Sequence, residues 1–311
     1  MTQQKERWLQ IEISLPAELS EAVTNFLMEN GAQGVFQEEA PEPQGGGFAE
    51  DVSREALKAY LPDDVRVENR LTSLQNYLDE LGRLFPDLPR PSWRTDWIVD
   101  PNWGEEWKKY FKPLRVTKNI IIKPTWERYS PGGHDILIEI DPGMAFGTGQ
   151  HPSTRMCLQA MEDLILQDRA ARNRHVLDVG TGTGILGIAA AKLGAGKVVC
   201  VDIDKQAVAI AAENARMNGV EDRVGVLYRD AATLAETFDL IVANLTAKML
   251  IKLRPRLIDL LNRGGFLVIS GIIEQNKDDI EHHFLAEPFL VHRTIIEKEW
   301  RCYVLLNEGY R

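Results

Sequence analysis

Apolar and polar residues follow two different periods in the first part of this chain. Residues 8–15 alternate with a period of two, as in a half-buried strand, and residues 17–30 carry apolar side chains at helical spacing. Further strand and helix patterns complete the order strand, helix, strand, strand, helix, strand, at residues 32–38, 55–61, 67–85 and 93–99. This βαββαβ order predicts a small ferredoxin-like α+β domain.

A different arrangement begins at residue 176, where apolar strands alternate with helices and predict a doubly wound α/β sheet. We expect its strands at 176–179, 197–203, 224–228, 238–243 and 265–270, with an antiparallel pair at 289–296 and 300–306. We also expect residues 119–123 and 135–140 to form a hairpin. The predicted organisation is a recognition domain at 1–92, an amphipathic linker helix at 93–112 and a catalytic domain at 113–311.

The strand at 176–179 leads into a turn that contains Gly180, Gly182 and Gly184. Tight turns need backbone angles that side chains resist, and glycines also let a ligand approach the backbone. Asp202 follows about 20 residues later, at the end of the next strand, where an acid can accept hydrogen bonds from both ribose hydroxyls. The pattern therefore predicts a nucleotide site at the carboxyl edge of the sheet.

The register of this turn bears on which nucleotide it binds. Residues 182–187 match GxGxxG, the dinucleotide pattern, which is weak evidence alone. The strand ends at Val179, however, so counting from Gly180 places Ile185 where the third glycine belongs. The arrangement hDhGxGxG, with Asp178 two residues before the first glycine, is typical of S-adenosylmethionine-dependent methyltransferases. NAD binding and a structural turn without a ligand remain the alternatives.

Two more polar residues follow strands of the predicted sheet. Asn244 comes directly after the fourth strand, where its amide oxygen can accept hydrogen bonds from a substrate amine. A simple turn asparagine is the alternative. Asp230 follows the third strand, and it either faces an adenine amine or caps a helix.

The glycine- and proline-rich segment 142–154 precedes the sheet and is expected to close over a cofactor. Ser153 or Thr154 is expected to cap the helix that follows it. His151 lies in this segment without an acidic partner in sequence, so we interpret it as part of the loop rather than as a base.

Composition narrows the class of protein. The polar start is unlike a secretory signal, no apolar run reaches the length of a membrane helix, and three dispersed cysteines predict reduced thiols, a cytoplasmic location and no metal site. Residues 1–90 hold 8 Lys/Arg and 17 Asp/Glu, whereas residues 91–311 hold 28 and 29. The acidic first part favours a basic protein partner over nucleic acid, with improved solubility as the alternative.

The motifs, taken together, resemble one family. AFGTGQHPST, VLDVGTGTGILGIAA, VDID and VANL, in this order, are similar to the ribosomal protein L11 methyltransferase (PrmA) family over most of the chain. The resemblance implies a Rossmann-like class I methyltransferase sheet with a ferredoxin-like N-terminal domain that grips the ribosomal protein. It also implies methylation of lysine side chains and of the terminal α-amine of protein L11. Gln150 and Thr181 depart from the family, which often has threonine and cysteine there.

The expected site combines the motifs with this resemblance. Its cofactor is S-adenosylmethionine, the amine-positioning residue is Asn244, and the cofactor-binding residues are Thr154, Asp178, Gly180, Gly182, Asp202 and Asn244. The expected partner is ribosomal protein L11, with no membrane, no direct nucleic acid and a monomeric state. The alternatives are a lysine methyltransferase acting on another protein such as an electron-transfer flavoprotein subunit, an NAD-dependent oxidoreductase, and a non-catalytic binding protein.

Overall fold

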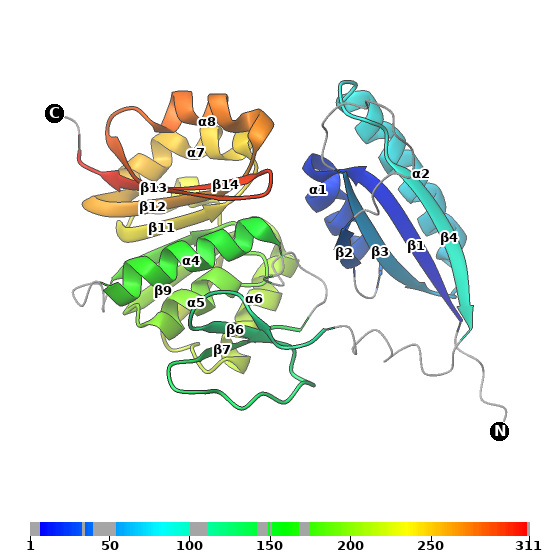
Figure 1. Ribbon diagram of the computed structural model, residues 1–311, viewed down its shortest axis with the longest axis horizontal. Coiled ribbons are helices and arrows are strands. Elements are labelled where there is room, and N and C mark those ends of the chain that lie inside the picture. The colour runs from blue at the N-terminus through cyan, green and yellow to red at the C-terminus, as the bar shows by residue number, and fades with distance from the viewer. Residues whose placement is uncertain are drawn as a thin grey trace. The chain divides into compact units, whose positions relative to one another are not determined.

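The computed structural model describes residues 7–32, 35–39, 54–99, 111–141, 149, 151–167 and 174–309 (Figure 1). The chain divides into two compact units. The first unit is Met1–Phe111 with Pro142–Phe146, and the second is Lys112–Asp141 with Gly147–Arg311. No helix among the described residues is long and apolar enough to cross a membrane.

The first unit contains a four-stranded antiparallel sheet with the strand order β2-β3-β1-β4. Along β1, the buried apolar side chains of Leu9, Ile11 and Ile13 alternate with partly exposed polar side chains. Leucines of both helices pack in the same core, so α1 and α2 cover one face of the sheet. The ferredoxin-like prediction is confirmed, with the elements β1 (Arg7–Pro16), α1 (Ala17–Glu29), β2 (Val35–Glu39), β3 (Arg54–Pro62), α2 (Val67–Leu84) and β4 (Ser92–Val99).

The last strand of this sheet changes the predicted domain boundary. Ser92–Val99 pairs along its whole length with β1, so an end of the domain at residue 92 would remove one edge of the sheet. The segment 93–112, expected as a linker helix, therefore begins with a strand. Residues 100–110 of this segment lie outside the described residues, and residues 111–112 are not helical.

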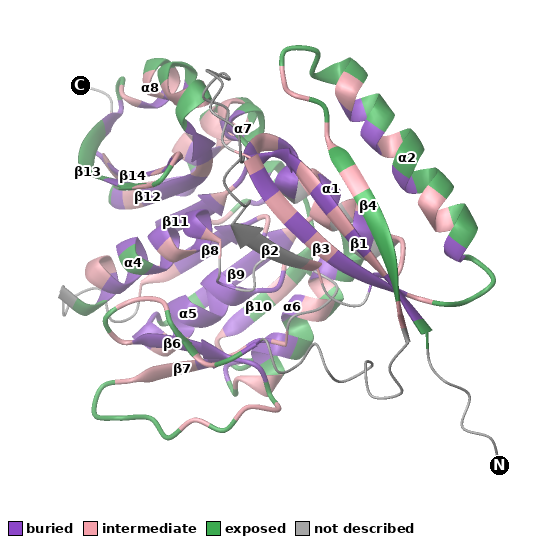
Figure 2. Ribbon diagram, turned by 45° about the vertical axis from the view of Figure 1, so that its right-hand side comes forward, coloured by how far each residue is buried: buried purple, intermediate pink, exposed green. Residues whose placement is uncertain are grey.

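The second unit contains a seven-stranded sheet with the order β10-β9-β8-β11-β12-β14-β13. The first five strands are parallel, and β14 pairs antiparallel with β12 and β13. The central strands are buried on both faces (Figure 2), which explains their nearly continuous apolar sequences. The doubly wound prediction is confirmed, with strands β8 (His175–Val179), β9 (Lys197–Asp202), β10 (Val224–Tyr228), β11 (Phe238–Asn244), β12 (Leu261–Ile273), β13 (Phe289–Glu297) and β14 (Trp300–Asn307).

Helices α5 (Ile185–Leu193), α6 (Lys205–Met217) and α7 (Ala247–Leu260) connect parallel strands of this sheet, and the short 3-10 turn η3 (Ala231–Thr233) lies between β10 and β11. Helix α4 (Pro152–Gln167) precedes β8, and the 3-10 turn η4 (Glu274–Asn276) and helix α8 (Lys277–Phe284) lie between β12 and β13. Gly187 shows how closely α5 packs on the sheet, because a Cβ atom there would lie 2.2 Å from Cys200 Sγ. The helix that follows the glycine turn is therefore fixed against its neighbouring strand.

A separate three-stranded sheet corrects the expected hairpin. Its strands are β5 (Leu114–Arg115), β6 (Ile120–Lys123) and β7 (Ile136–Glu139). Strands β6 and β7 pair in parallel, not antiparallel as a hairpin requires. Parallel pairing needs a long crossover connection. Residues 124–135 supply that connection, and the apolar pattern of the two strands does not reveal their direction.

Candidate functional site

Four polar or glycine positions meet at one edge of the seven-stranded sheet. Strands β10, β9, β8 and β11 are neighbours, and their carboxyl ends lead into Asp230, Asp202, Gly180 and Asn244, respectively. Ligands of doubly wound sheets bind at this edge. The structure therefore brings together the four strand-end positions that the sequence marked.

The glycine turn holds three residues in the left-handed region, with φ of 71° at Gly180, 54° at Gly182 and 82° at Gly184. The amides of Gly180 and Thr181 both donate to Val201 O, at 2.9 and 3.1 Å, which ties the turn to β9. A Cβ atom at Gly180 would lie 2.5 Å from Leu245 Cδ2. The turn is therefore fixed in place, and the packing admits no side chain at Gly180.

Asp178 lies beneath this turn and is fully buried. Its Oδ2 accepts hydrogen bonds from Thr181 Oγ1 at 2.6 Å and from the amide of Gly187 at 3.1 Å. Burial raises the pKa of Asp178 to about 6, although these two hydrogen bonds oppose the shift. Its Oδ1 has no hydrogen-bond partner among the described residues. Such a buried, unpaired acceptor fits a site that receives a donor from a ligand.

Asp202 is held by two backbone amides. Its Oδ2 accepts from the amide of Gly182 at 3.1 Å, and its Oδ1 accepts from the amide of Asp204 at 3.0 Å. Each carboxylate oxygen has a second lone pair. The side chain is therefore oriented in advance and can still accept hydrogen bonds from a pair of hydroxyl groups.

Asn244 and Thr154 are 90 positions apart in sequence and lie in contact. Asn244 Nδ2 donates to Thr154 Oγ1 at 3.3 Å, and Thr154 is buried at the start of α4. No donor to Asn244 Oδ1 occurs in the part of the chain that the structure describes, so this oxygen can accept a further hydrogen bond. Gly271 supports the arrangement, because a Cβ atom there would lie 2.6 Å from Leu245 O and 3.1 Å from Asn244 Oδ1.

The cap of α4 differs from the expected Ser153 or Thr154. Helix α4 begins at Pro152, two residues earlier than a cap at Ser153 implies, so His151 occupies the capping position and its Nδ1 accepts from the amide of Ser153 at 3.2 Å. The ring also packs on Trp300, with centroids 4.5 Å apart. Burial lowers the pKa of His151 to about 4, with a further contribution from the positive charge of Arg155. The interpretation of His151 as loop structure agrees with this geometry.

The burial of His151 beside Arg155, which lowers its pKa, predicts a pH dependence of stability. The folded state resists protonation between pH 6.5 and 4, while the unfolded chain accepts the proton, so stability is lost as pH falls through this window. The variant His151→Asn keeps a cap acceptor without titrating there. We expect the wild type to lose up to roughly 3 kcal/mol relative to this variant between pH 7 and pH 4, measured by urea unfolding.

Two features of this comparison isolate His151. The raised pKa of Asp178 has the opposite effect, stabilising the folded state as pH falls, but it is common to both proteins and cancels. The exposed His134→Asn substitution serves as the control. A wild type and a His151→Asn variant that respond identically to pH would contradict the lowered pKa of the buried His151.

Asp230 has the structural role that the sequence left open. Its Oδ1 accepts from the amide of Ala232 at 2.9 Å and caps η3. Two apolar side chains close to Asp202 were not singled out from the sequence. Ile203 follows Asp202 directly and is 65% exposed. Tyr228 lies opposite Asp202 in the β10–β9 register and is 57% exposed. Exposed apolar surface beside a ribose-type acid suits the face of a purine. The sequence signal that could have indicated this surface is the isoleucine directly after Asp202.

The loop expected to close over the cofactor lies largely outside the described residues, because 142–148 and 150 are not described. Gly149 is described, and it is buried with a φ of 80°. A Cβ atom there would lie 2.0 Å from Ile122 Cδ1. Among the described residues, no three His, Cys, Asp or Glu side chains cluster in a way that could hold a metal ion.

The sheet order, the glycine turn, the acid after β9 and the asparagine after β11 define a Rossmann-like methyltransferase fold. The chain belongs to the ribosomal protein L11 methyltransferase (PrmA) family, whose model matches residues 7–308. It is a methyltransferase that uses S-adenosylmethionine, as this family does. The unpaired Asp178 Oδ1 and the two-amide cradle of Asp202 fit that cofactor.

Individual relatives agree with this assignment. A ribosomal protein L11 methyltransferase from Pelobacter propionicus is 40% identical over 300 residues, which cover 94% of this chain and 96% of that protein. The protein of the same name from Geobacter sulfurreducens is 35% identical and covers 97% of this chain and 99% of that protein. A crystal structure of a ribosomal protein L11 methylase from Lactobacillus delbrueckii subsp. bulgaricus superposes with a TM-score of 0.57 at 32% identity, covering 64% of this chain and 100% of that one.

Proposed function

We propose that this enzyme transfers methyl groups from S-adenosylmethionine to lysine side-chain amines and the N-terminal amine of ribosomal protein L11. The relatives carry this substrate in their names. The observation that carries the proposal is the contact between Asn244 and Thr154 at the carboxyl edge of the sheet. This contact uses the amide nitrogen of Asn244 and leaves its oxygen as an acceptor for an incoming amine.

We assign the cofactor-binding roles as follows. Asp202 accepts hydrogen bonds from the ribose hydroxyls, and the turn at Gly180 and Gly182 lets the methionine part approach the backbone. Asp178 braces the turn and offers Oδ1 to a donor. Thr154 lines the site through its contact with Asn244. Ile203 and Tyr228 offer exposed apolar surface to the adenine ring, and the Lys205 ammonium lies over the Tyr228 ring at 5.4 Å from its centroid.

The protein contributes alignment rather than covalent chemistry. When bound, S-adenosylmethionine supplies an electrophilic methyl group on a sulfonium centre. Asn244 Oδ1 accepts an N–H of the attacking amine and directs its lone pair along the line of displacement. A lysine amine with an ordinary pKa near 10.4 must be neutral to attack, and an apolar surrounding lowers that pKa. His151 is not placed as the base, because its Nδ1 is engaged at the α4 cap.

The two units have separate roles in this proposal. The first unit selects the protein substrate, and the second carries the methyltransferase site. Residues 1–90 hold 17 Asp/Glu against 8 Lys/Arg, which favours a partner rich in lysine and arginine. We place the enzyme in the cytoplasm as a monomer that meets its substrate without direct contact to nucleic acid.

Mass spectrometry of purified protein L11 tests the proposed function. After incubation with the enzyme and S-adenosylmethionine, the mass of L11 should rise in steps of about 14 Da, one for each methyl group transferred. A basic ribosomal protein other than L11 is the control, and its mass should stay unchanged. Binding of the cofactor without any mass increase in L11 would reject this substrate and leave another protein as the methyl acceptor.

A further inference from the structure

Helix α2 contains a glycine that its fold does not require. Gly82 lies in the last turn of α2, and its backbone stays outside the left-handed region. Among the described residues, a Cβ atom there would meet Arg90 alone, at 3.8 Å from Cγ, which is ordinary van der Waals contact. Glycine inside a helix is less stable than alanine. The missing side chain therefore calls for an explanation outside the packing of the domain.

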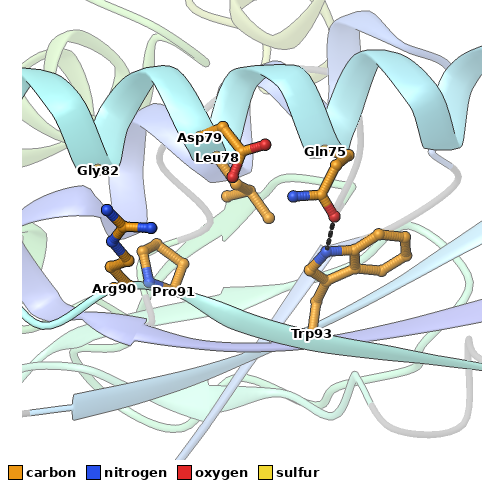
Figure 3. Close-up of a pocket in the computed structure, with 7 residues that line it drawn as sticks. All are labelled: Gln75, Leu78, Asp79, Gly82, Arg90, Pro91 and Trp93. Carbon is orange, nitrogen blue, oxygen red and sulfur yellow. Dashed lines mark hydrogen bonds between the residues drawn. The ribbon is translucent and has the colours of Figure 1, made fainter.

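The space beside Gly82 is a hollow of about 210 Å³ between α2 and the segment that enters β4. Figure 3 shows its lining residues, which come from one face of α2 and from the start of β4: Gln75, Leu78, Asp79, Gly82, Arg90, Pro91 and Trp93. Leu78 is buried in the domain core. Trp93 Nε1 donates to Gln75 Oε1 at 3.0 Å, which fixes the indole ring at one side of the hollow. We call this hollow the α2–β4 groove.

Two opposite charges line the α2–β4 groove without neutralising each other. Asp79 and Arg90 are both exposed, and neither side chain forms an ion pair or a side-chain hydrogen bond with another described residue. An aromatic face and an unpaired carboxylate together suit a cationic side chain. The guanidinium of Arg90 suits a carbonyl or carboxylate acceptor.

The strand next to the groove is an unpaired edge. Among the strands of the described residues, the order β2-β3-β1-β4 gives β4 a neighbour on one side only. Most of its side chains are exposed (Figure 2), including Arg94, Thr95 and Trp97. An exposed edge strand is a template for pairing with an extended segment of another chain, and an adjoining pocket selects its side chains.

We propose that the α2–β4 groove and the free edge of β4 dock an extended segment of the protein substrate. A lysine or arginine of that segment lies against Asp79 and Trp93, and a carbonyl or carboxylate of the segment meets Arg90. Gly82 keeps the groove open. This inference rests on the proposed function, because it takes ribosomal protein L11 as the partner, and it locates the docking surface far in sequence from the methyl-transfer residues.

Filling the groove tests this proposal in the full-length enzyme. Gly82→Met places a flexible apolar chain in the hollow, and Asn76→Met, on an exposed position of α2 outside the lining, is its matched control. We expect Gly82→Met to raise KM for L11 by about tenfold with little change in kcat, because docking and not chemistry is impaired. Gly82→Ala should raise Tm by about 2 °C and raise KM less.

Removing the charge of Asp79 provides a second test of the docking surface. Asp79→Asn should raise KM for L11 by about threefold, whereas Glu80→Gln, an exposed acid of α2 outside the groove, should leave it unchanged. Hydrogen exchange of the β4 amides should slow when L11 is added. S-adenosylmethionine affinity should be the same in all variants.

The outcomes separate this inference from the proposed function. A wild type that methylates L11, with Gly82→Met folded and its KM unchanged, would overturn the docking surface and leave the function standing. A wild type that neither binds nor methylates L11 would overturn both.

Discussion

Asn244→Ala is expected to slow methylation of L11 by roughly 100-fold, because the reacting amine loses the acceptor that aligns it. The amide of Asn244 is fixed on one side by Thr154 Oγ1 at 3.3 Å, so its oxygen is oriented before the substrate arrives. Single-turnover kinetics with saturating cofactor measures this step directly. The same variant should still bind S-adenosylmethionine, although Asn244 also borders the cofactor site.

A pair of substitutions at Thr154 provides the control for this prediction. Thr154→Val removes the acceptor for Asn244 Nδ2 while keeping the shape of the side chain, and it should slow methylation in the same direction. Thr154→Ser keeps the hydroxyl group and should retain most of the rate. Asn244→Ala with an unchanged methylation rate would eliminate the positioning role of this residue.

The second large effect is expected on cofactor affinity. Asp202→Ala removes a carboxylate that two backbone amides hold in place, so the ribose hydroxyls lose their acceptor and Gly182 loses its partner. The loss of one hydrogen bond to a charged group costs about 1.5–3 kcal/mol, so we expect the affinity for S-adenosylmethionine to fall by at least roughly 10- to 100-fold. Isothermal titration calorimetry measures this change.

A charge-matched control separates the ribose contact from a general electrostatic effect. Asp222→Ala removes an acid that is largely exposed. That variant should bind the cofactor like the wild type. Equal affinities for Asp202→Ala and the wild type would reject the assignment of Asp202 to the ribose.

The sequence predicted those parts of the site that depend on local signals. Gly180 and Asp202 are candidates that the sequence singles out, because a left-handed turn and a strand-end acid each leave a residue-type signature. The contact between Asn244 and Thr154 was not predicted, since it joins segments 90 positions apart and depends on how α4 packs beside β11. Periodicity specifies which face of an element is buried, not which distant side chain it meets.

The errors of prediction have related causes. Residues 119–140 show two apolar strands, but alternation does not encode whether they run parallel or antiparallel, so the hairpin was wrong. The strand predicted at 93–99 is confirmed as β4, and its pairing with β1 places residues 93–99 in the sheet rather than in the linker helix that was expected at 93–112. His151 was not recognised as the cap of α4, since histidine is not among the residues preferred at that position.

The α2–β4 groove could not be predicted from the sequence either. The apolar spacing of residues 67–85 predicted the helix, and the structure places it at Val67–Leu84. That spacing says nothing about Gly82, whose meaning depends on the distance to Arg90 across the hollow. A glycine that the backbone conformation does not require can be recognised only when the space around it is known.

A crystal structure with S-adenosylhomocysteine, the product of methyl transfer, tests most directly that the four strand ends form the methyl-donor site. We expect both ribose hydroxyls to lie about 3 Å from the Asp202 carboxylate oxygens. We also expect the sulfur to face the side on which Asn244 Oδ1 is open. A product molecule bound away from Asp202 and from the Gly180 turn would contradict the account.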